Sequence, residues 1–70
     1  MGDLVMAELE DLLSTAEFAQ KAKVPAGTVR HWRDVGTGPA YLRIGRHVRY
    51  RPSDVMAWLE GQRVSTGDAA

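Results

Sequence analysis

Cysteine is absent from this 70-residue chain, and so is any long apolar run. Without thiols the chain has no disulfide framework, no thiolate to bind zinc and no cysteine nucleophile. No apolar run approaches the ~20 residues that cross a bilayer, and the N-terminus lacks the basic flank and apolar stretch of a signal peptide. We therefore expect one small domain that resides in the cytoplasm and has no membrane partner.

Residues that commonly carry catalysis or bind metals are few and scattered. His31 and His47 stand sixteen positions apart, with no carboxylate at ligand spacing, so we expect no metal site. Asp11, Asp34 and Asp54 form no evident pair for hydrolytic work. The sequence therefore predicts a protein that is not an enzyme, has no cofactor and has no small-molecule substrate.

Charge is unevenly distributed along the chain, although its formal net value is zero. Residues 21–51 contain eight of the nine Lys and Arg residues and a single acid, Asp34, which is a local excess of +7. The remaining residues contain eight of the nine acids and a single base, Arg63. A positive field focused on one part of a small domain attracts a polyanion, so this distribution favours nucleic acid as the partner.

Two short helices joined by a turn of about three residues are predicted before the middle of the chain. Ser14 and Glu17 match the capping-box pattern, which begins a helix at about residues 15–22. Pro25 disfavours helical geometry in the residue before it but suits the opening of a new helix, at about residues 26–35. This arrangement is a helix-turn-helix.

The second helix has an apolar stripe and a polar, basic surface. Val29, Trp32 and Val35 form the expected buried stripe, and Gly36 is the expected left-handed C-cap. An outward helix face of this kind fits a major groove, where guanidinium groups bind guanine or phosphate. An ordinary solvated helix face explains the same residues about as well. The candidate DNA-binding residues on this helix are Ala26, Gly27, Thr28, Arg30, His31 and Arg33.

A β-hairpin is predicted at residues 41–51, where apolar and polar residues alternate on both sides of Gly45-Arg46. Glycine at the first of the two central positions favours a type II′ turn. By period two, Leu42, Ile44, Val48 and Tyr50 are expected to face the core, and Arg43, His47, Arg49 and Arg51 to share one outward face. Arg46 at the tip suits a narrow minor groove. A basic edge that only blocks strand pairing usually employs Lys, so we favour DNA contact. The candidate wing residues are Arg43, Arg46, His47, Arg49 and Arg51.

A last helix is predicted after the hairpin, with Ser53 as its N-cap and Gly61 near its end. Its expected buried residues are Val55, Trp58 and Leu59. The spacing of residues 1–11 allows a short amphipathic helix in an acidic segment. The expected organisation is this N-terminal segment (1–11), a DNA-binding domain (12–63) and a disordered tail (64–70).

Four motifs occur in an order that resembles a known family: LLSTAEFA (12–19), VPAGTVRHW (24–32), RIGRHVRY (43–50) and SDVMAWL (53–59). The set is similar to the excisionase-type winged helix-turn-helix domains, which are relatives of the MerR-like regulators. The resemblance covers about residues 12–62. It implies a mainly α fold with a small β-hairpin, with the second helix in the major groove and the hairpin, as a wing, at the adjacent minor groove. The family commonly has Ser where this chain has Pro25, which removes an N-cap worth about 1 kcal/mol.

Double-stranded DNA is the partner that the resemblance implies, and it leaves three functional hypotheses. The first is an excisionase, or recombination directionality factor, of a phage or integrated element. Several copies of such a protein bind repeated sites and bend the DNA, so that an integrase carries out excision. The second is a small transcription regulator on the same scaffold. The third is a protein-interaction module whose basic face docks an acidic partner.

Overall fold

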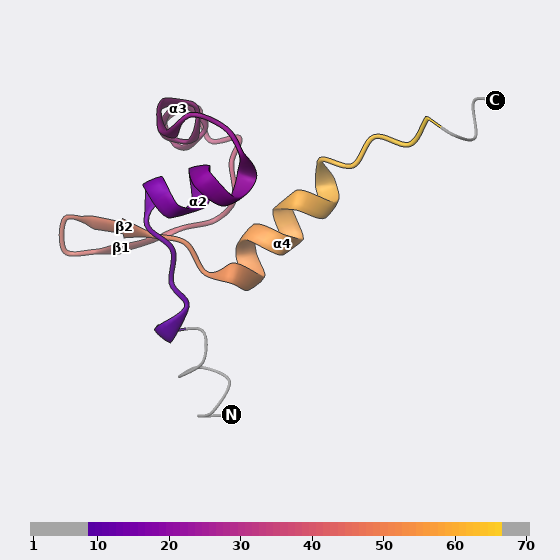
Figure 1. Ribbon diagram of the computed structural model, residues 1–70. Helices are drawn as coiled ribbons and strands as arrows, with labels where there is room; N and C mark the ends of the chain where they lie inside the picture. The colour runs from indigo at the N-terminus through magenta and orange to yellow at the C-terminus, as the bar shows by residue number, and fades with distance from the viewer. Residues whose placement is uncertain (1–8, 67–70) are drawn as a thin grey trace.

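The computed structural model of the chain describes residues 9–66. Its elements, in chain order, are α2 (Thr15–Ala22), α3 (Ala26–Val35), β1 (Leu42–Ile44), β2 (His47–Arg49) and α4 (Pro52–Gly61). Figure 1 shows α3 on one side of α2, with the hairpin and α4 towards the other side. Within residues 9–66, the helices α2, α3 and α4 and the two-stranded antiparallel hairpin confirm the predicted mainly α, winged helix-turn-helix fold.

The two ends of the chain lie largely outside the described residues. Leu9 and Glu10 are helical and Asp11 is in a turn, but the rest of the helix predicted for residues 1–11 falls outside them. The same holds for the last four residues of the tail predicted to be disordered. Both expectations therefore stay predictions.

The helix α2 begins with the predicted capping box. The Ser14 hydroxyl accepts a hydrogen bond from the Glu17 backbone N–H (3.1 Å), and the Glu17 carboxylate accepts one from the Ser14 N–H (2.8 Å). These two bonds satisfy backbone donors that the first turn of a helix leaves unpaired. The helix ends at Ala22, and its C-cap Lys23 has a left-handed φ of +62°.

The helix α3 has the predicted bounds, and its C-cap Gly36 has a φ of +77°. One residue of its predicted buried stripe is wrong. Val29 is buried, but Val35 is 55% exposed. At 100° per residue, a separation of six residues rotates Val35 about 120° away from Val29 around the helix axis. A spacing of three repeated twice therefore leaves the buried face.

Aromatic rings fill the centre of the molecule. The Phe18 ring lies 4.9 Å from that of Tyr50, 6.0 Å from that of Trp58 and 6.3 Å from that of Trp32, measured between centroids. The two tryptophan rings are 5.0 Å apart. Tilted and edge-on pairs at these distances contribute beyond the area that they bury. The buried core comprises Phe18, Ala19, Val29, Tyr50 and Val55.

The hairpin register corrects the predicted assignment of side chains to faces. The strands pair Leu42 with Arg49, Arg43 with Val48 and Ile44 with His47. Directly opposed residues share one face of an antiparallel pair. The apolar residues of the two strands therefore do not share a face, and neither do Arg43, His47 and Arg49. The two-residue turn pairs each even-numbered residue of β1 with an odd-numbered residue of β2. Even-numbered residues therefore lie on one face of the hairpin in β1 and on the other face in β2.

The hairpin has a defined turn at its tip and a hydrogen-bonded anchor at its base. Gly45 has a φ of +63° and Arg46 does not have a positive φ, which agrees with the predicted type II′ turn. Beyond β2, Tyr50 and Leu13 exchange two backbone hydrogen bonds, of 2.9 and 2.8 Å. The base of the hairpin is thereby joined to the residues just before α2.

The helix α4 begins two residues earlier than the predicted N-cap, Ser53, would place it. Pro52 occupies its first turn and Arg51 is the N-cap, so Ser53 lies inside the helix instead of capping it. Proline is suited to this first position because its φ is already helical. Val55 is buried as expected, but Leu59 is 41% exposed. The Trp58 indole N–H donates to the Thr37 carbonyl (2.9 Å), which ties α4 to the loop after α3.

Candidate nucleic-acid interface

The solvent-facing stripe of α3 is formed by four exposed residues: Gly27, Arg30, His31 and Asp34. Their spacing of three and four places them on one face of the helix. Val29, on the opposite face, is 1% exposed. Two of the candidate groove residues, Arg30 and His31, are thus neighbours at the centre of an open helix face. Asp34, which was not among the predicted groove residues, shares this face.

The first turn of α3 is open. Pro25 is its N-cap and provides no side-chain hydrogen bond. The Thr28 N–H bonds to the Pro25 carbonyl (3.0 Å), and within residues 9–66 no side-chain cap hydrogen bond is formed at this helix start. A methyl group added at Gly27 would meet only the Arg30 guanidinium, at an ordinary 3.9 Å. Packing within the described part of the protein therefore does not require glycine at this position.

Arg33 does not share the outward face of α3. Its Nη1 donates to the Thr15 hydroxyl (3.1 Å) and to the Tyr50 phenol oxygen (3.3 Å). Its guanidinium carbon also lies 5.9 Å from the centre of the Tyr41 ring. The partners stand 18 and 17 positions away in the chain, so no local pattern could have identified them. One of the predicted groove residues thus makes tertiary contacts inside the protein.

The distal half of the hairpin carries three exposed bases, Arg43, Arg46 and His47. Arg46 is in the turn at the tip, whereas Arg43 and His47 lie on opposite faces of the two strands. The hairpin therefore presents a base on each face and one at its end. In Figure 1 the hairpin projects away from the helices.

The other two predicted wing arginines have partners near the base of the hairpin. The Arg49 Nη1 donates to the Val48 carbonyl (2.7 Å). The Arg51 Nε lies 3.4 Å from a carboxylate oxygen of Asp54, in the first turn of α4. Both contacts are local, reaching one and three residues along the chain, and the five predicted wing residues thus divide into a distal set of three and a basal set of two.

Glu17, in the capping box of α2, has a lowered pKa. The hydrogen bond from the Ser14 backbone N–H is the main cause that lowers the pKa of Glu17 below its ordinary value of 4.5. The bond with the Ser14 side chain adds to this effect, and the positive charges of Arg49 and Lys21 make smaller contributions. The carboxylate is thus held in its charged form as a helix cap.

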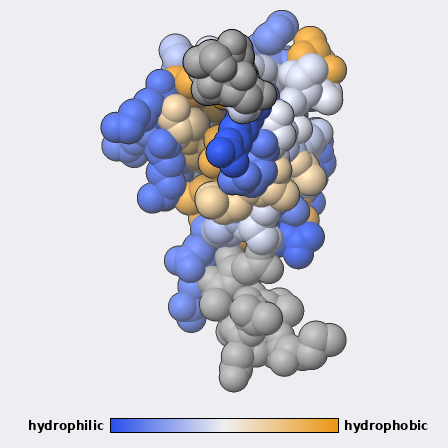
Figure 2. All heavy atoms as spheres, turned by 90° about the vertical axis from the view of Figure 1, so that its right-hand side faces the viewer, coloured by the Kyte–Doolittle hydropathy of each residue, from blue (hydrophilic) through white to orange (hydrophobic). Residues whose placement is uncertain are grey.

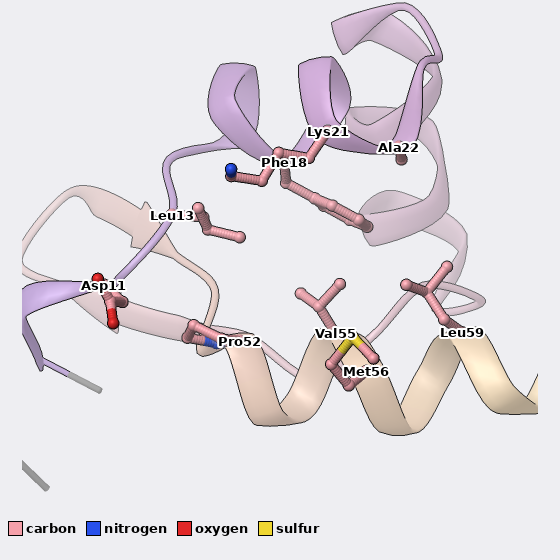
Figure 3. Close-up of a pocket in the computed structure, with 9 residues that line it drawn as sticks. All are labelled: Asp11, Leu13, Phe18, Lys21, Ala22, Pro52, Val55, Met56 and Leu59. Atoms are coloured by element: carbon pink, nitrogen blue, oxygen red, sulfur yellow. The ribbon is translucent and has the colours of Figure 1, made fainter. Parts of the chain in front are cut away.

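A groove of about 390 Å³ between α2 and α4 was not visible in the sequence. Figure 3 shows Phe18 and Ala22 on one side of it and Val55, Met56 and Leu59 on the other. Figure 2, which views the molecule from the side of α4, shows apolar surface among hydrophilic side chains. The groove explains the exposure of Leu59, because α4 packs on the core mainly through Val55 and Trp58.

Residues 9–66 contain neither a side-chain cluster suited to a metal ion nor a helix able to span a membrane. No three His, Cys, Asp or Glu residues in this range are grouped closely enough to hold a metal ion. No helix in the same range has both the length and the apolar character needed to span a bilayer.

Comparison with known proteins identifies one family. The model of the helix-turn-helix domain family, which includes excisionase-like DNA-binding proteins, matches residues 12–63, well over half of the chain. No curated protein matches the chain. The match spans both helices of the helix-turn-helix, the hairpin and α4, and it supports DNA as the partner.

Proposed function

We propose that this chain, which belongs to the helix-turn-helix domain family, binds double-stranded DNA at specific sequences and acts as an excisionase, or recombination directionality factor. In this role it binds repeated sites and bends the DNA, and it directs an integrase towards excision. The observation that carries the proposal is the pairing of two exposed basic elements in one small domain: Arg30 and His31 on α3, and Arg43, Arg46 and His47 on the hairpin.

The helix α3 is the proposed major-groove element. A major groove about 12 Å wide admits one helix, whose outward side chains then reach base edges. Arg30 and His31 occupy that outward face, and Arg30 is suited to a bidentate contact with guanine or phosphate. In this proposal the N–H groups of Ala26 and Gly27, together with Thr28, hold a phosphate at the positive, uncapped end of α3.

The hairpin is the proposed minor-groove wing. Arg46 at its tip can enter a narrow, A·T-rich minor groove, where the negative potential attracts arginine. Arg43 and His47 lie on opposite faces of the hairpin, so each can approach the phosphates of one wall of the groove. A ribbon with bases on both faces fits between two strands of phosphate better than one with all of its charge on one face. Arg49 and Arg51, near the base of the hairpin, add to the positive potential of this wing.

An architectural role follows from the limited surface of one copy. One recognition helix and one wing bury a modest area on DNA, so a single copy binds weakly. Several copies on adjacent repeats increase the affinity by acting together. Contacts to both grooves also favour a bent duplex, since bending lets the DNA follow more of the protein surface.

The first test locates the protected DNA and measures its bend by circular-permutation gel shift. Cooperative protection of direct repeats beside an attachment site, with a bend, is the expected result. A single unbent site that overlaps a promoter would replace the excisionase role with that of a transcription regulator. Equal binding of specific and random duplexes would instead favour the module that docks an acidic partner.

Salt dependence measures how many bases reach phosphate. If Arg30, Arg43, Arg46 and one lysine of the basic region do so, log K should fall with log[salt] at a slope of about −3.6. Arg33, Arg49 and Arg51 are left out because they have partners in the protein. A slope near −6 or steeper would show that these arginines exchange their protein partners for phosphates.

A further inference from the structure

Arg33 lies where the three parts of the proposed DNA-binding unit meet. It belongs to α3, it donates to Thr15 at the start of α2, and it donates to Tyr50 at the base of the hairpin. The Tyr41 ring, just before β1, completes the site, with its centre 5.9 Å from the guanidinium carbon. The side chain is partly buried, so solvent competes less with these contacts than it does at the surface.

The two hydrogen bonds depend on the direction of the guanidinium N–H groups, and not only on the positive charge of Arg33. Both use Nη1, whose two hydrogens lie in the plane of the guanidinium and point to fixed positions. The acceptors belong to residues that are anchored by other contacts. Tyr50 is 1% exposed and is bonded through its backbone to Leu13, and Thr15 is the first residue of a capped helix. Arg33 therefore links α3 to the start of α2 through Thr15 and to the base of the hairpin through Tyr50, and these two links constrain the angle of α3 relative to the hairpin.

We propose that Arg33 is a positioning residue: it fixes the hairpin relative to α3, so that the two DNA-contacting elements reach adjacent grooves as one rigid unit. This inference rests on the proposed function. It predicts that Arg33 increases the affinity for DNA without recognising a base. A helix and a wing that are already aligned lose less conformational freedom on binding. Arg30, three residues earlier and exposed, keeps the role of reading the groove.

The test compares Arg33→Lys and Tyr50→Phe with the matched control Arg30→Lys. Arg33→Lys keeps the charge but loses the paired donors, and Tyr50→Phe removes only the acceptor oxygen while retaining the ring in the core. Both should lower affinity for the preferred duplex by about tenfold, with the same base preference at every position of the site. Arg30→Lys should instead flatten the preference at one position. Loss of preference at one position in Arg33→Lys alone would overturn the proposal, because it would show that Arg33 reads a base.

A double-mutant cycle separates positioning from general loss of stability. If Arg33 and Tyr50 act through their shared bond, the double variant should bind only as weakly as either single variant. Independent, multiplied losses would contradict the proposal. Circular dichroism and thermal unfolding confirm that each variant is folded at the temperature of the binding measurement.

A measurement without DNA keeps this inference distinct from the proposed function. Residual dipolar couplings of backbone N–H groups report the orientation of β1 and β2 relative to α3 in the free protein. In Tyr50→Phe and Arg33→Lys the couplings of the hairpin should shrink or change, while those within α2 and α3 keep their pattern. Unchanged couplings would refute the positioning role even if the protein binds DNA. Changed couplings in a protein that binds no duplex would support it while the proposed function fails.

Discussion

The helix α3 and the hairpin both present arginines to solvent, but they are supported in different ways. The inner face of α3 contains Val29, which is 1% exposed, and Trp32, which packs against the core. By contrast, none of the six strand residues of the hairpin is buried, and Ile44 near its tip is 50% exposed. The hairpin is held instead at its base, through Tyr50 and the contacts that Tyr50 makes with Leu13 and Arg33.

This difference separates two kinds of contribution to binding. Substitutions on the inner face of α3, at Val29 or Trp32, should alter folding and, through it, DNA contact. Substitutions in the distal hairpin remove little buried area and should alter DNA contact alone. The hairpin is therefore the place where charge can be changed with least effect on the fold.

The largest expected effect comes from Phe18→Ala. Phe18 is 1% exposed and contacts three aromatic rings, so the variant should lose about 3–5 kcal/mol of stability. That loss is comparable to the whole stability of a domain of this size. Urea denaturation followed by circular dichroism measures it. Ile44→Ala, in the half-exposed part of the hairpin, should cost less than about 1 kcal/mol. Similar losses in both variants would show that the hairpin belongs to the core.

A second prediction compares two arginines that differ in the groove they are proposed to reach. Arg30→Ala should cost about 1–3 kcal/mol in binding and relax base preference at one position. Arg46→Ala should weaken binding to all duplexes more evenly and make the salt slope less steep by about 1. Fluorescence anisotropy over a range of salt concentrations, with a set of single-base variants of the site, gives both quantities. Interchanged results would assign base reading to the hairpin.

The sequence was sufficient for the features that depend on local chemistry. Ser14, Pro25 and Gly36 mark helix ends through capping and backbone preference, so the bounds of α2 and α3 followed from them. Gly45 marked the turn for the same reason. Capping and turn signals act within a few residues, and the sequence displays all of those residues together.

The sequence was insufficient where a result depended on distant parts of the chain. The division of Arg43 and His47 between two faces follows from strand register, which is set by pairing across the turn. The inward direction of Arg33 depends on Thr15 and Tyr50, which only the folded chain brings near it. The open groove beside Leu59 likewise depends on how α4 packs against α2.

Gly27→Ala should give opposite effects on stability and binding. Glycine in a helix costs up to about 1 kcal/mol relative to alanine, and the added methyl group would only touch the Arg30 guanidinium, at a comfortable 3.9 Å. The variant should therefore unfold at a higher urea concentration than the natural chain. If a phosphate approaches the first turn of α3, the same methyl group should weaken DNA binding. A gain in stability with unchanged affinity would place the phosphate elsewhere.

The smallest expected effect concerns the pH dependence of the α2 cap. The Ser14 backbone N–H lowers the pKa of Glu17 in the folded protein, so the charged carboxylate stabilises the fold above its unfolded pKa. This contribution is lost as pH falls through the lowered folded pKa. Natural protein should therefore exceed Glu17→Gln in stability at pH 7, and the difference should vanish in acid, as urea denaturation at several pH values can show. Because hydrogen bonds dominate over the charges of Arg49 and Lys21, 0.5 M salt should leave most of the difference in place. If salt removes the difference, the positive charges of Arg49 and Lys21, and not the hydrogen bonds of the cap, control the pKa of Glu17. The hairpin and α2 would then be coupled by charge.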